Sequence, residues 1–173
     1  PRCKLGIYRR RNGKPLQGHL IMPKVSYRPA RVFAMQLLYA MEITGQTPGE
    51  ALPGILESQP LADEQKKYGM NLVDLVQAHR DELDEDIKSA SAHWEIDRMA
   101  KLDRIVSRIA MVELLYVPDI PIKVAISEAV QIATKYSTDG SGAFVNGLLT
   151  GFMQKHNIVA TTPTQKSKAN KGV

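Results

Sequence analysis

Residues 28–42 read RPARVFAMQLLYAME, an almost unbroken apolar stretch that begins with two arginines and no carboxylate. Pro29 suits the first position of a helix, where its missing N–H costs nothing. Gly45 is a usual helix terminator, because it tolerates the left-handed backbone conformation. The stretch therefore predicts a helix from about residue 29 to residue 44.

The two arginines occupy the end of this helix that already carries positive charge. A helix N-terminus behaves as about half a positive charge, so carboxylates are favoured there and cations are not. Arg28 is the expected cap, because the residue before a proline avoids the helical conformation, and the Ser26 hydroxyl is an alternative cap. Free N–H groups together with Arg28 and Arg31 on one face predict a site for an anion, most naturally a phosphate. The alternative is that both arginines are simply solvated surface charges.

The composition is that of an ordinary globular domain. The chain has 173 residues, of which 43% are hydrophobic and 24% charged. The lone Cys3 excludes an internal disulfide and fits a reducing cytoplasm, and no segment is long enough to span a membrane. We therefore expect a cytoplasmic protein with no membrane association.

The net charge of +5 hides a strong asymmetry along the chain. Residues 1–41 carry a net charge of +9 and contain no acid, residues 42–139 carry −8, and residues 140–173 carry +4. A basic arm and tail therefore flank an acidic body. This segregation indicates a polyanion bound by the arm and a basic protein partner on the body, although a solvated arm without a partner is the alternative.

The chain divides into three parts. Residues 1–25 predict a basic, flexible extension, residues 26–157 a helical domain, and residues 158–173 a disordered basic tail. No alternating strand pattern is present, so the fold class is all-α, a single-domain bundle of about six or seven helices. A loop is expected around Pro48 and Pro53.

The apolar periods place the later helices. One period in residues 68–87 predicts one long helix or two consecutive ones. In residues 94–116 an apolar stripe contains Val106 and Ile109, with Arg104 and Arg108 outside it. Pro121 opens another helix, and the last helix contains AFVNGLLTGFM, residues 143–153.

Signals for catalysis are weak. The four histidines have no metal-ligand spacing, and DGSGAFVNG (residues 139–147) misses the dinucleotide-binding pattern. We interpret this glycine-rich stretch as a helix start, with Ser141 as cap and Gly147 allowing close helix packing. The sequence therefore predicts no catalytic residue, metal site or cofactor.

Three stretches, in this order, resemble the NusB family of transcription antitermination factors. They are ARVFAMQLLYAMEITG (30–45), WEIDRMAKLDRIVSRIAMVELLY (94–116) and DIPIKVAISEAVQIATKYSTDGSGAFVNGLL (119–149). The last stretch is the most specific, and the resemblance covers about residues 27–152. It implies a non-catalytic RNA-binding adaptor. Members pair with the ribosomal protein NusE and bind single-stranded boxA-type RNA in nascent ribosomal RNA leaders. They promote read-through by RNA polymerase in an antitermination complex and assist ribosomal RNA maturation.

The resemblance also implies site residues. The residues that match the family's RNA surface are Arg28, Arg31, Gln36, Tyr39, Ser141 and Phe144. Tyr39 and Phe144 would offer stacking faces for unpaired bases. The chain departs from the family in having fewer arginines around residue 28 and Ala143 where a lysine is common. We therefore expect RNA affinity either to be lower or to depend more on the partner. The acidic residues Asp81, Glu82 and Glu85 are the expected face for the basic partner.

Two other interpretations remain open at this point. The same helical module precedes the catalytic domain of a ribosomal RNA cytosine methyltransferase, so the chain could be such an accessory domain. A homodimer that buries the arginine surface and acts as a store or scaffold is the other.

Overall fold

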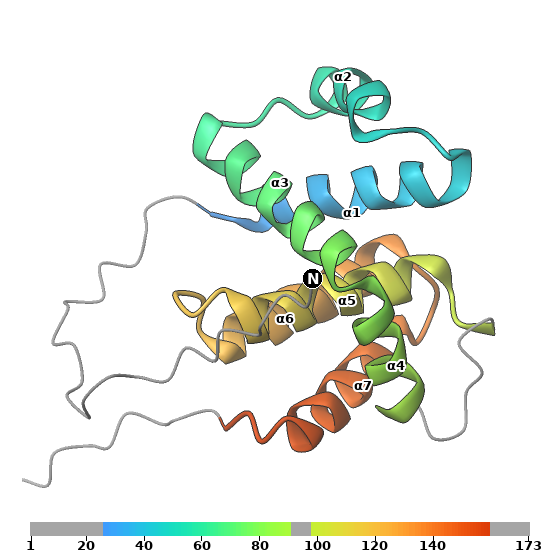
Figure 1. Ribbon diagram of the computed structural model, residues 1–173, viewed down its shortest axis with the longest axis vertical. Coiled ribbons are helices and arrows are strands. Elements are labelled where there is room, and N and C mark those ends of the chain that lie inside the picture. The colour runs from blue at the N-terminus through green and yellow to red at the C-terminus, as the bar shows by residue number, and fades with distance from the viewer. Residues whose placement is uncertain (1–25, 91–97, 160–173) are drawn as a thin grey trace, which may run out of the picture.

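The computed structural model describes residues 26–90 and 98–159, which form seven α-helices and no strand (Figure 1). The helices are α1 (Arg28–Thr44), α2 (Pro48–Ser58), α3 (Asp63–Ala78), α4 (Arg80–Ala90), α5 (Lys101–Tyr116), α6 (Ile122–Tyr136) and α7 (Ser141–Lys155). The predicted all-α bundle is confirmed. The extension 1–25 and residues 160–173 of the predicted tail lie outside the described residues. Across the described ranges, no helix combines the length and apolar character that crossing a membrane requires.

Helix α5 forms the centre of the bundle. It contacts five of the other six helices, with α1 and α3 on one side and α4 and α7 on the other (Figure 1). Its apolar side chains Ile105, Val106 and Met111 are almost fully buried, and so are the polar residues Ser107 and Glu113. A helix that is covered on all sides therefore carries a charged group, Glu113, into the core, and a buried charge needs a partner.

The arginines of α5 do not lie on a solvent face, contrary to the sequence expectation. Arg108 is only 2% exposed, and its guanidinium binds Asp84 of α4 with two hydrogen bonds of 2.8 Å. Arg108 and Arg104 also both pair with Glu42 at the end of α1. The prediction that the apolar side chains of this stripe are buried was correct. The opposite side of α5 is not exposed, because α1 and α4 cover it.

The segment with Pro48 and Pro53 is helix α2 and not the predicted loop. Its N-terminus is well capped, because the Glu50 carboxylate accepts hydrogen bonds from the Thr47 N–H (2.7 Å) and hydroxyl (2.8 Å). Ala51 is buried, and the helix packs against α1. Pro53 removes one backbone hydrogen bond within the helix, and the cap and the packing offset this loss.

Two further predictions agree with the structure, the helices in residues 68–87 and the end of α1, whereas α5 begins only at Lys101 and Pro121 caps α6 from just outside the helix. The period in residues 68–87 forms two helices, α3 and α4, which meet at His79. Helix α1 ends where Gly45 adopts a positive φ of 69° and its N–H binds the Met41 carbonyl.

The glycine that allows close packing in α7 is not Gly147, as expected, but Gly142. A Cβ at Gly142 would collide with the Thr134 hydroxyl of α6, whereas Gly147 faces open space.

We predict that Gly69→Ala destabilises the fold. A Cβ at Gly69 of α3 would lie 2.6 Å from Cδ1 of Phe33 and 2.9 Å from the Ala30 carbonyl oxygen, a backbone atom that cannot rotate away. Overpacking of this kind costs about 1–3 kcal/mol. Urea denaturation measures the loss. Gly147→Ala is the matched control, because it fills open space and gains up to about 1 kcal/mol of helix propensity; equal stability of the two variants would contradict the packing at Gly69.

Candidate nucleic-acid interface

The N-terminus of α1 has no strong side-chain cap. The cap residue is Tyr27 and not Arg28, and no cap hydrogen bond comes from its side chain. The Ser26 hydroxyl accepts a long hydrogen bond of 3.4 Å from the Arg28 N–H, as the alternative prediction had it. The Tyr27 ring packs against the Tyr68 ring of α3, with 4.5 Å between the ring centroids. This end of α1 therefore keeps weakly satisfied donors beside two aromatic rings.

Arg28 is half exposed and ion-paired. Its side chain is 46% exposed, and its Nε and Nη2 atoms donate to the two oxygens of Glu128 on α6, at 2.8 and 2.7 Å. Nη2 also donates to Oε1 of Gln131 at 2.7 Å. The hydrogen bond from Arg28 lowers the pKa of the Glu128 carboxyl, which is therefore ionised at neutral pH. A carboxylate of the protein already occupies one edge of this guanidinium.

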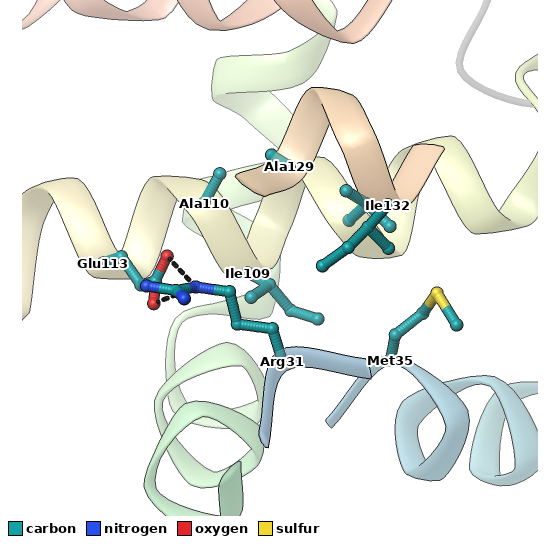
Figure 2. Close-up of a pocket in the computed structure, with 8 residues that line it drawn as sticks. Arg31, Met35, Ile109, Ala110, Glu113, Ala129 and Ile132 are labelled. Atoms are coloured by element: carbon teal, nitrogen blue, oxygen red, sulfur yellow. Dashed lines mark hydrogen bonds and ion pairs between the residues drawn. The ribbon is translucent and has the colours of Figure 1, made fainter. Parts of the chain in front are cut away.

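Arg31 is buried, in contrast to the sequence expectation of a second solvent-facing arginine. Its Nε donates to both oxygens of Glu113 on α5, at 2.8 and 3.0 Å (Figure 2). Its Nη1 lies 3.8 Å from Glu128. The cavity beside it, lined by residues such as Met35 and Ile132, measures about 10 Å³, which admits one water molecule at most. A phosphate cannot reach Arg31 in this conformation, because α5 and α6 cover its side chain.

The buried pair extends to a third helix. The Tyr68 hydroxyl of α3 donates to Glu113, and the Arg31 guanidinium lies 5.8 Å from the centre of the Tyr68 ring. Burial and the Glu113 charge raise the pKa of Tyr68 well above its usual value, so the phenol stays protonated and remains a donor. Glu113 thus joins α1, α3 and α5.

Gln36 and Tyr39 follow Arg28 and Arg31 along α1. Tyr39 comes three helical turns after Arg28, so both side chains leave α1 on the same side, roughly 16 Å apart along its axis. Residue Tyr39 is 40% exposed, whereas Gln36 is half-buried and its Oε1 is buried. Tyr39 is therefore accessible to solvent on the same side of α1 as the half-exposed Arg28, three helical turns away.

The turn between α6 and α7 places Ser141 inside the protein. Ser141 is 2% exposed, and its hydroxyl donates to Oδ2 of Asp103 on α5 at 2.9 Å while it accepts the Thr138 N–H at 3.1 Å. The cap residue of α7 is Gly140, so Ser141 is one position inside the helix. Its hydroxyl holds the start of α7 against α5 and does not face solvent.

Phe144 lies in an open hollow at the same turn. The hollow measures about 450 Å³, within the size range of small-molecule sites. Its other lining residues come from the segment that leads into α5 and from the turn that leads into α7, and they include Arg98, Asp103 and Ser141. The Phe144 ring is half-buried and packs against the core, so it combines a structural contact with an accessible edge.

The three predicted partner residues lie on the solvent side of α4. Asp81, Glu82 and Glu85 are exposed, while Leu83 and Ile87 on the same helix are buried. Glu82 lies 3.2 Å from the His79 ring, and Glu85 pairs with Lys88 at 2.6 Å. All three carboxylates are therefore accessible to solvent, and their role in docking stays a prediction.

Sequence reasoning missed the two carboxylates that hold the arginines. Glu113 is the single acid within the apolar run RIAMVELLY, and Glu128 is the single acid of α6. An acid inside an otherwise apolar helix needs a charged partner when it is buried. That signal predicts a pair for each carboxylate, but the sequence does not name the arginine.

The described residues thus form a small all-helical domain that presents an exposed aromatic residue and a half-exposed arginine on α1, a hollow at the start of α7 and an acidic face on α4. The model of the NusB family matches residues 28–154. The chain therefore belongs to the NusB family, and the resemblance noted in the sequence is confirmed.

Similar proteins agree with this assignment. The transcription antitermination protein NusB of Myxococcus xanthus is 43% identical over 126 residues, which cover 70% of this chain and 90% of the relative. NusB of T. maritima has a TM-score of 0.69 at 30% identity and covers 76% of this chain and 93% of its own. A crystal structure of the antitermination factors NusB and NusE in complex with double-stranded RNA has a TM-score of 0.66 at 27% identity, covering 75% of this chain and 97% of its own.

We predict that Glu113→Ala strongly destabilises the protein. It leaves the Arg31 charge buried without its closest partner and removes the acceptor of Tyr68, and breaking a buried ion pair in this way costs about 3–5 kcal/mol. Urea denaturation at neutral pH measures the loss. Arg28→Ala is the comparison, because its half-exposed pair contributes about 1 kcal/mol or less. A cost for Glu113→Ala as small as that for Arg28→Ala would contradict the buried role of the pair.

Proposed function

We propose that this protein is a non-catalytic, cytoplasmic transcription antitermination factor. With the ribosomal protein NusE it binds single-stranded boxA-type RNA in nascent ribosomal RNA leaders. The bound pair promotes read-through by RNA polymerase in an antitermination complex and assists ribosomal RNA maturation.

The observation that carries this proposal is the match of almost the whole helical domain to NusB proteins, one of them in a complex with NusE and RNA. Membership in the family supports the activity in antitermination. The half-exposed Arg28 and the exposed Tyr39 ring on one side of α1 support an RNA surface at that place.

The roles of the site residues follow from their exposure. Arg28 contacts phosphate, and Tyr39 and Phe144 stack on unpaired bases, while Gln36 contributes a polar contact on the same helix. Arg31 and Ser141 support this surface from inside, because their side chains are buried and hold α1 and α7 against α5. One half-exposed arginine gives modest affinity, so the partner contributes much of the binding free energy.

We predict that Arg28→Ala weakens binding to boxA-type RNA and to a scrambled RNA by similar factors. Phosphate contacts do not depend on sequence, and each lost contact to a single strand lowers the slope of log affinity against log salt by roughly 0.7. Fluorescence anisotropy at several salt concentrations, with and without NusE, measures both effects. Tyr39→Ala is expected to reduce the preference for boxA-type RNA instead.

The controls identify the ligand. A double-stranded RNA of the same sequence tests whether the strand must be unpaired. Selective tightening of boxA-type RNA by NusE supports the adaptor function. Equal, weak binding of all RNAs with or without NusE, unchanged in Arg28→Ala, would overturn it.

We propose the acidic face of α4 as the NusE contact. Replacing Asp81, Glu82 and Glu85 by Asn, Gln and Gln removes three exposed charges and is expected to slow association with the basic partner and to reduce its salt dependence. Surface plasmon resonance with immobilised NusE measures the association rate. Binding of RNA by the variant alone should stay unchanged.

A matched triple variant tests whether position matters. Glu57→Gln, Asp63→Asn and Glu64→Gln remove the same charge from exposed positions on α2 and α3. If both triple variants slow NusE binding equally, the α4 face is not the specific contact.

A further inference from the structure

The guanidinium of Arg28 is largely occupied by the protein itself. An arginine side chain has five N–H donors. Three of them are engaged in the described structure: Nε and one N–H of Nη2 by Glu128, and the other N–H of Nη2 by Gln131. The two remaining donors both belong to Nη1, so a phosphate can be bound through one nitrogen only unless an existing bond breaks.

The pairing also removes the charge that would attract RNA. Arginine binds phosphate best through two parallel hydrogen bonds, and the Nε–Nη2 edge is one of the edges that can form them. Here Glu128 occupies that edge with the same geometry that a phosphate would adopt. The side chain of Glu128 is 16% exposed, so its charge is only partly screened by solvent.

Glu128 is not required to keep Arg31 in place. Arg31 has its own short contacts to Glu113 at 2.8 and 3.0 Å, while its distance to Glu128 is 3.8 Å. The ion pair that joins the helices thus remains when the Glu128 charge is removed. The shortest contact of the Glu128 carboxylate is to Arg28, whose side chain is half exposed to solvent.

We propose that Glu128 is an internal competitor of RNA phosphate for Arg28 and so lowers the intrinsic RNA affinity of this chain. This inference rests on the proposed RNA-binding function and adds an affinity-determining residue on α6. Binding of a phosphate at Arg28 exchanges the carboxylate for a phosphate oxygen. RNA that makes no further contacts gains little from this exchange.

The test is Glu128→Gln, which keeps the size of the side chain and removes its charge. We expect the variant to bind boxA-type and scrambled RNA about two- to fivefold more tightly, the range of a partly exposed ion pair. The slope of log affinity against log salt should steepen by roughly 0.7, the value for one recovered phosphate contact. Fluorescence anisotropy on the full chain measures both, and thermal unfolding shows whether the variant is folded.

Two controls separate competition from simple charge repulsion. Glu57→Gln makes the same change in net charge on exposed α2 and should leave RNA affinity unchanged. In the double variant Arg28→Ala with Glu128→Gln, the gain should disappear, because the competitor acts through Arg28. A gain that persists without Arg28, or no gain in the single variant, would overturn the inference.

The outcomes also separate this inference from the proposed function. If Arg28→Ala weakens RNA binding and Glu128→Gln does not tighten it, the RNA site stands and the competitor role is wrong. If neither variant changes binding and boxA-type RNA is not preferred even with NusE, both the RNA site and the competitor role are wrong.

Discussion

The buried ion pair between Arg31 and Glu113 determines how the first half of the chain packs onto the second. It joins α1 to α5, and the Tyr68 hydroxyl adds α3 to the same carboxylate. A buried charge without a partner is very unfavourable, so these three helices can approach one another only in the register that brings the two charges together. Arg31, in the first turn of α1, is thus part of the core.

The two arginines of the first turn of α1 therefore have different roles, one in the core and one at the surface. Arg31 lies toward α5 and is neutralised inside the protein, whereas Arg28 lies at the edge and is held by Glu128 of α6. Both carboxylates come from helices far along the chain. Carboxylates of the protein thereby neutralise the positive end of α1. Two arginines in the first turn suggest two phosphate contacts, but only Arg28 remains partly accessible to a polyanion.

Burial of α5 explains the second network of charges in the same way. Arg108 and Arg104 bind Glu42 of α1, and Arg108 also binds Asp84 of α4. A helix with one apolar stripe predicts a solvent-facing side opposite, but α5 has neighbours all round. Its arginines consequently fix the positions of α1 and α4. The ion pair between Arg108 and Asp84 orients the acidic face of α4, and the apolar periodicity of α5 did not predict this pair.

The sequence by itself determined the helical class, the approximate positions of the helical segments other than α2, the end of α1 at Gly45 and membership in the NusB family, because these follow from periodicity, terminators and motif spacing along the chain. It placed Arg28 and Tyr39 correctly at the surface, but it placed Arg31 and Arg108 there as well. Helix α2 was not predicted, because a proline inside a helix is unfavourable. The cap at Glu50 and the packing against α1 offset the hydrogen bond that Pro53 removes. Only the tertiary structure decided which charges are buried and which carboxylate each arginine binds, because those partners lie 24 to 100 residues apart in sequence. The physical reason is that the solvation of a side chain depends on how many helices surround it, and that number is a property of the assembled bundle.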